Sequence, residues 1–135
     1  MSRVGSIIDS LDDIHEKKID IDSISDKYKN GNCYESAMKQ MWDYYRKGIK
    51  EVKLVHGVVT GQGELDGIQF SHAWIEVNGI VLDMSNGREV VMPKNLYYKL
   101  GKIKITREYD YEDMLKMIDK YGTYGPWDKV FNKYP

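Results

Sequence analysis

The sequence has little of several residue types on which other classes of protein depend. It holds one cysteine and three prolines in 135 residues, and its formal net charge is −1. A single cysteine excludes an intramolecular disulfide and a zinc site built from several cysteines. The near-neutral charge gives no electrostatic reason to expect a nucleic acid or an anionic membrane surface as partner.

Long hydrophobic runs are also missing. No stretch of about 18 apolar residues occurs, so the sequence predicts no membrane-spanning helix. The N-terminal segment has no uninterrupted apolar stretch and no small-residue cleavage site, so we expect no signal peptide and a cytoplasmic location. Hydrophobic residues make up 41% and charged residues 30% of the chain, which indicates a folded globular protein rather than a disordered one.

The chain length predicts a single domain over residues 1–135, in three parts. Residues 1–30 are polar, with apolar residues at helical spacing, and we expect a helical lead-in there. Residues 31–92 are expected to form the core, a helix followed by antiparallel strands. Residues 93–135 add a final strand, a helix and an aromatic tail that packs down. This order predicts an α+β fold.

A helix is predicted from Cys33 to about Arg46. Apolar residues recur at helical spacing, Asn32 is suited to cap the N-terminus, and Gly48 is suited to end the helix. Cys33 then lies where unpaired backbone N–H groups and the helix dipole favour a thiolate and can hold an oxyanion. A cysteine that only packs in the core is the plainer interpretation, but the polar turn over residues 30–32 favours a nucleophile.

Two predicted strands, joined by Asn78-Gly79, bring a histidine and an aspartate together. Asn-Gly between alternating strands is a strong signal for a two-residue hairpin turn. Counting back from the turn, Trp74 faces Asp83, and His72 becomes a diagonal neighbour of Asp83. Diagonal positions lie roughly 7 Å apart, within reach of a hydrogen bond. The alternate residues of the His72 strand are apolar and are expected to face the core (Ala73, Ile75 and Val77).

A cysteine at a helix start, a histidine on a strand and an aspartate on the next strand suit a thiol triad. Asp83 would fix the tautomer of His72, and His72 would take the proton of Cys33, so that the thiolate attacks a carbonyl and forms a thioester. Plainer interpretations stay open, with His72 as a satisfied polar residue on its strand and Asp83 as a surface residue that starts a turn.

These motifs resemble the papain-like superfold. The segment Asn-Cys-Tyr-Glu-Ser-Ala at a helix start, followed by Ser-His-Ala-Trp-Ile-Glu-Val-Asn-Gly-Ile-Val-Leu-Asp, is most similar to the transglutaminase-like branch and the small bacterial or phage cysteine peptidases related to it. The resemblance covers about residues 30–86. It implies a Cys-bearing helix packed on an antiparallel β-sheet, with Cys33, His72 and Asp83 as the catalytic triad. The spacing from His72 to Asp83 is short, which indicates a minimal domain.

The resulting hypothesis is a thiol-dependent acyl-transfer enzyme, a cysteine peptidase, amidase or transglutaminase-like protein, that acts on a protein, peptide or amide without a cofactor. Hydrolysis is slightly favoured over transfer, because it needs only water at the thioester. No clear side-chain oxyanion donor precedes Cys33; Asn32 is the main candidate, beside Asn30 and Tyr28, and Trp74 is a candidate for substrate binding. The alternative is a catalytically inactive papain-like module that binds protein, and a small chain of either kind would suit a phage or mobile-element product in its host cytoplasm.

A zinc site is a further alternative. His56 lies on the strand before His72, in reach of the same sheet face, so that Cys33, His56, His72 and Asp83 together offer four zinc ligands. None of the ligand spacings typical of zinc sites is present, and we therefore expect no metal.

Overall fold

The structure, a computed structural model, describes residues 32–61, 66–84 and 89–135 of the chain. In these ranges one antiparallel sheet has the strand order β4-β3-β2-β1-β5. Its strands are β1 (Val52–Thr60), β2 (Gln69–Val77), β3 (Ile80–Asp83), β4 (Val90–Pro93) and β5 (Lys104–Tyr109). The helices are α3 (Cys33–Arg46), α4 (Lys94–Leu100) and α5 (Tyr111–Tyr121), followed by the 3-10 helix η2 (Lys129–Lys133). The α+β class is thus confirmed, while the helical lead-in expected over residues 1–30 lies outside the described residues.

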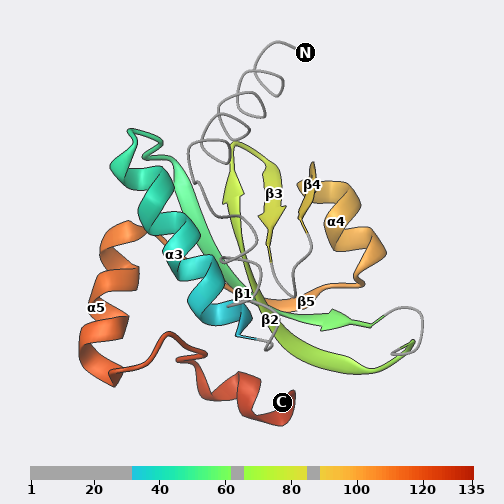
Figure 1. Cartoon of the computed structure of the whole chain (residues 1–135). Coiled ribbons are helices and arrows are strands. Elements are labelled where there is room, and N and C mark those ends of the chain that lie inside the picture. The colour runs from blue at the N-terminus through green and yellow to red at the C-terminus, as the bar shows by residue number, and fades with distance from the viewer. Residues whose placement is uncertain (1–31, 62–65, 85–88) are drawn as a thin grey trace.

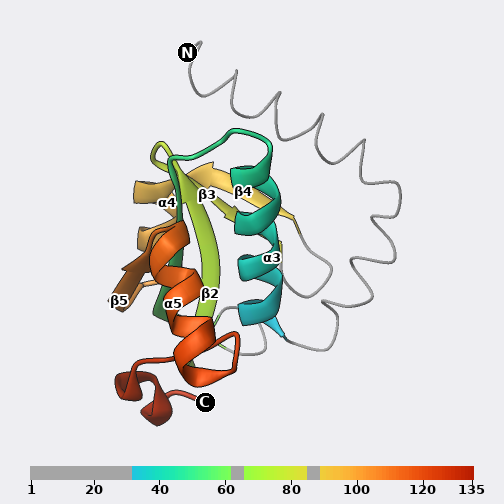
Figure 2. The same cartoon turned by 90° about the vertical axis from the view of Figure 1, so that its left-hand side faces the viewer.

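Helices cover both faces of the sheet, as Figures 1 and 2 show. On one face α3 packs against β1 and β2, and Met114 of α5 joins the same apolar cluster. On the other face, α4 brings Tyr97 and Tyr98 against Trp74. Every residue of β2 from His72 to Val77 is therefore buried. The sequence predicted a core on the Ala73 side of this strand, and α4 adds a second covered face. None of the helices in the described ranges combines the length and apolar character needed to span a membrane.

The sequence did not predict the helix α4, nor the short 3-10 helix η2 in the aromatic tail. The helix α4 has seven residues, begins directly after Pro93 and has no side-chain hydrogen bond at its N-cap. A helix this short gains little from its own backbone bonds, because nucleation is costly and most helical stability in proteins comes from packing. Its contacts with Trp74 therefore hold it in place, and a local pattern carries little sign of it.

The helix α3 begins where the sequence predicted. Asn32 Oδ1 accepts a hydrogen bond from the Glu35 backbone N–H at 3.2 Å, as expected of an N-cap. Ser36 Oγ donates to the backbone carbonyl of Met84 at 2.7 Å. Because Met84 follows the last residue of β3, this bond places the start of α3 beside the end of that strand.

The Asn78-Gly79 turn sets the predicted register between β2 and β3. Both residues have positive φ angles, 49° and 79°, as a two-residue hairpin turn of this type requires. The paired positions agree with the prediction (Val77 with Ile80, Glu76 with Val81, and Ile75 with Leu82). This register puts Asp83 at the end of β3, diagonally across from His72.

Packing around Trp74 leads to a stability prediction. Gly57 of β1 lies under the indole, where an added Cβ would come within 2.7 Å of Trp74 Cη2 and 3.2 Å of Thr106 Cγ2. We expect Gly57→Ala to lower the free energy of unfolding by about 1–3 kcal/mol, as overpacking does, measured by urea denaturation. In a Trp74→Phe background, which lacks the outer ring, the same substitution should cost clearly less. Equal costs in both backgrounds would contradict this account.

Candidate active site

His72 and Asp83 form the hydrogen bond that the hairpin register predicts. His72 Nε2 lies 2.8 Å from Asp83 Oδ2, and the two residues are only 9% and 7% exposed. The hydroxyl of Tyr97, from α4, donates to the same Oδ2 atom at 2.6 Å. Because the pKa of His72 is raised to about 10, its Nε2 carries a proton at neutral pH and donates to the same oxygen.

Cys33 is the third member of this cluster. Its side chain is a hydrogen-bond partner of His72, and the residue is 7% exposed at the first position of α3. Three segments far apart in the sequence, the start of α3, the middle of β2 and the end of β3, therefore meet at one imidazole. The structure brings together all three residues that the sequence proposed for a triad.

The charges around His72 favour its protonated form. Burial by itself lowers the pKa of His72, but the Asp83 charge and the hydrogen bonds to Asp83 and Cys33 raise it to about 10. Burial and the Asp83 carboxylate together raise the pKa of Tyr97, so its hydroxyl keeps the proton and stays a donor. At neutral pH the cluster therefore holds an imidazolium between the Asp83 carboxylate and the sulfur of Cys33.

Tyr97 is the residue of the cluster that sequence reasoning missed. It lies on α4, which the sequence did not predict, so nothing placed it on the face of β2 that carries His72. The pair Tyr97-Tyr98 shortly after Pro93 is the one local signal for it, because two adjacent tyrosines need partners for two hydroxyl groups.

Of the residues expected to contact the substrate or its oxyanion, Asn32 is exposed to solvent and Trp74 is buried. The Oδ1 atom of Asn32 accepts from the Glu35 backbone N–H, so this side chain is used as the cap of α3 directly before Cys33. Trp74 is fully buried, and its ring packs in the core and offers no surface to a ligand. Asn30 and Tyr28 lie outside the described residues.

His56 does not belong to the cluster. It pairs with Ala73 in the sheet, so it faces the side opposite to His72, and the expectation that it shares that face is wrong. Neither ring nitrogen has a hydrogen-bond partner. The ring is fully buried among the aromatic side chains of Tyr34, Tyr109, Trp127 and Phe131. Burial lowers the pKa of His56 to about 3, so the ring is neutral in the folded protein.

The zinc alternative finds no support in the described part of the chain. There, no group of three or more histidine, cysteine, aspartate or glutamate side chains is arranged to hold a metal ion. The separation of His56 from His72 by the thickness of the sheet is one reason, because it divides the four residues that the sequence considered as ligands.

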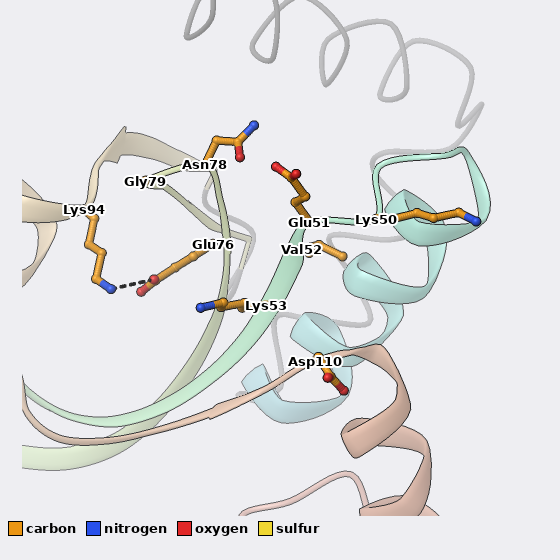
Figure 3. A pocket seen from close by; sticks show the side chains of 9 residues that line it. All are labelled: Lys50, Glu51, Val52, Lys53, Glu76, Asn78, Gly79, Lys94 and Asp110. Carbon is orange, nitrogen blue, oxygen red and sulfur yellow. Dashed lines mark ion pairs between the residues drawn. The ribbon is translucent and has the colours of Figure 1, made fainter.

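A hollow of about 460 Å³ lies at the hairpin end of the sheet and is separate from the cluster (Figure 3). An ion pair lines one side of it, with Lys94 Nζ 3.2 Å from Glu76 Oε1. Cys33, His72 and Asp83 do not line it. Most of the lining residues are charged, and the full set is Lys50, Glu51, Val52, Lys53, Glu76, Asn78, Gly79, Lys94 and Asp110. The chemistry of the cluster therefore does not extend into this hollow.

Comparison with known proteins returned no match. No family model matches the chain, and neither a curated protein nor a solved structure matches it. The resemblance to papain-like proteins therefore rests on the sequence motifs alone, and the structure shows an α+β fold with an antiparallel sheet.

The buried His56 predicts a loss of stability in acid. Its pKa is about 3 when folded and 6.5 in its ordinary state, so the neutral ring stabilises the fold fully above pH 6.5 and this contribution is lost as the pH falls towards 3. We expect the protonation of His56 on unfolding to remove about 2 kcal/mol of unfolding free energy between pH of about 7.5 and 5, measured by urea denaturation as the difference between the wild type and a variant without this ring.

The variant His56→Leu serves as the control, because it removes the titrating ring and two unpartnered buried nitrogens. His72 is present in both proteins and contributes equally to both, so we expect the unfolding free energy of the wild type to fall by about 2 kcal/mol relative to that of His56→Leu over that pH range. If the two proteins lose stability in parallel, His56 is not the group responsible.

Proposed function

We propose that this protein is a thiol-dependent acyl-transfer enzyme that works through a thioester on Cys33. The observation that carries the proposal is the shared imidazole: His72 has Asp83 at 2.8 Å on Nε2 and the thiol of Cys33 as a second hydrogen-bond partner. In this position His72 can hold the proton of Cys33 as an imidazolium and release it later, while the carboxylate stabilises the charged ring. Membership of the papain-like superfold, in its transglutaminase-like branch, is part of the same proposal.

In the first step of the proposed reaction, Cys33 Sγ bonds to the substrate carbonyl carbon, and His72 Nδ1 holds the thiol proton. The backbone N–H groups at the start of α3 stabilise the oxyanion. The bond from the carbonyl carbon to the leaving group then breaks, and His72 gives the proton to the departing amine. The products of this step are the free amine and a thioester on Cys33.

In the second step, water bonds to the thioester carbon and gives a proton to His72. The carbon–sulfur bond breaks, the carboxylic acid leaves, and the proton returns to Cys33. An amine in place of water gives transfer instead of hydrolysis. Hydrolysis is the favoured outcome, because transfer needs a second site that binds an amine and keeps water out.

The proposed substrates are carbonyl compounds of the protein, peptide or amide class, and the reaction needs no cofactor. Burial favours a second candidate function, because a thiol that is 7% exposed offers little surface to a substrate. In that second candidate, the protein is a catalytically inactive papain-like module that binds another protein, and the cluster only stabilises the fold. The two functions differ in the reactivity of Cys33.

Alkylation of Cys33 by iodoacetamide, followed by intact-protein mass spectrometry, separates them. The rate for a free thiol falls about tenfold for each pH unit below about 8.5, because only the thiolate reacts. Next to the imidazolium of His72, Cys33 should keep about a tenth or more of its plateau rate at pH of about 6. His72→Ala should lower the rate at that pH by about tenfold or more.

His56→Leu is the matched control for this experiment, because it removes the other buried histidine beside α3 and leaves the cluster intact. Its alkylation rate should equal that of the wild type. A wild-type rate that follows the free-thiol profile, unchanged in His72→Ala, would contradict the enzyme and favour the inactive module.

A further inference from the structure

We propose that Tyr97 is a positioning residue of the cluster, an inference that rests on the proposed function. Its hydroxyl donates to Asp83 Oδ2 at 2.6 Å, the same oxygen that lies 2.8 Å from His72 Nε2. Tyr97 therefore acts through Asp83. It selects which carboxylate oxygen faces the imidazole and sets how much of the negative charge His72 receives.

The core holds Tyr97 in position. Its ring packs against the indole of Trp74, with the ring centroids 5.2 Å apart, and Trp74 is fully buried. Asp83 is held from its backbone, because it is the last residue of β3 and pairs with Val90 of β4. The Asp83 carboxylate can still rotate about its side-chain bonds, and a second donor on the same oxygen restricts that rotation.

The hydroxyl also moderates the charge on the carboxylate. Among the described residues, the titratable groups that face His72 are Cys33 from α3, Asp83 from β3 and, through Asp83, Tyr97 from α4. The uncharged rings of Phe70 and Trp74 also lie beside it. A donor on Oδ2 takes up part of the electron density that would otherwise strengthen the bond to the imidazolium. Without it the pKa of His72 rises, and His72 becomes a weaker acid for the leaving group.

The same helix supplies a matched control. Tyr98 donates its hydroxyl to Glu76 Oε2 at 2.6 Å, which is the same bond at the same length from the adjacent residue. Glu76 also accepts from Trp74 Nε1 at 2.9 Å and pairs with Lys94 at the hollow (Figure 3). Tyr98→Phe therefore removes an equivalent tyrosine–carboxylate bond that belongs to the hollow and not to the cluster.

The test is the titration of His72, followed by NMR of protein labelled with carbon-13 at histidine Cε1, in three proteins. Relative to the wild type, Tyr97→Phe should raise the pKa of His72 by about half a unit or more, because a donor on Oδ2 is lost. Tyr98→Phe should leave the pKa of His72 unchanged. If Tyr97→Phe changes nothing, lowers the pKa, or shifts it no more than Tyr98→Phe does, the positioning role is overturned.

Two further measurements keep the result decisive. If Tyr97→Phe does not fold, 3-fluorotyrosine at position 97 keeps the ring and makes the hydroxyl a stronger donor, so it should lower the pKa of His72. If the pKa of His72 then stays unchanged, the proposal is overturned. The alkylation profile of Cys33 distinguishes the two levels of inference. A free-thiol profile in the wild type overturns the proposed function and with it the role of Tyr97, whereas a reactive Cys33 with an unmoved His72 overturns the role of Tyr97 alone.

Discussion

One buried hydrogen bond, between His72 Nε2 and Asp83 Oδ2, organises the centre of this molecule. Both groups are almost removed from water, and each would cost free energy there without the other. The bond depends on the Asn78-Gly79 turn, because a shift of one residue in the register would move Asp83 to the other face of the sheet. Cys33 and Tyr97 join the pair from helices on opposite faces, so both faces must be packed for the cluster to exist.

The helix α4 contributes more to this arrangement than its length of seven residues suggests. It covers the face of β2 on which His72, Trp74 and Glu76 lie. It also supplies a hydroxyl to two carboxylates that are buried in the described part of the chain, Tyr97 to Asp83 and Tyr98 to Glu76. Buried carboxylates are tolerated when they are hydrogen-bonded. By supplying these hydroxyl groups, the helix allows the sheet face that carries Asp83, Glu76 and His72 to be buried.

The sequence was sufficient for the features that depend on local chemistry. The cap at Asn32 marks the start of α3, and the Asn78-Gly79 turn sets the pairing of His72 with Asp83, because in each case neighbouring residues determine the backbone. Features that depend on distant packing were missed or misjudged. Tyr97 and the burial of Trp74 follow from α4, which packing stabilises, and the side of the sheet on which His56 lies follows from the pairing of β1 with β2.

The central claim is that Cys33 forms an acyl thioester with the help of His72 and Asp83. Incubation with p-nitrophenyl acetate and mass spectrometry of the intact protein tests it most directly, because the thiolate takes the acetyl group and releases p-nitrophenolate. We expect acetylation at Cys33, turnover of more than one equivalent as water regenerates the thiol, and loss of that turnover in His72→Ala. A protein that is acetylated no faster than its His72→Ala variant, and that never turns over, would contradict the account.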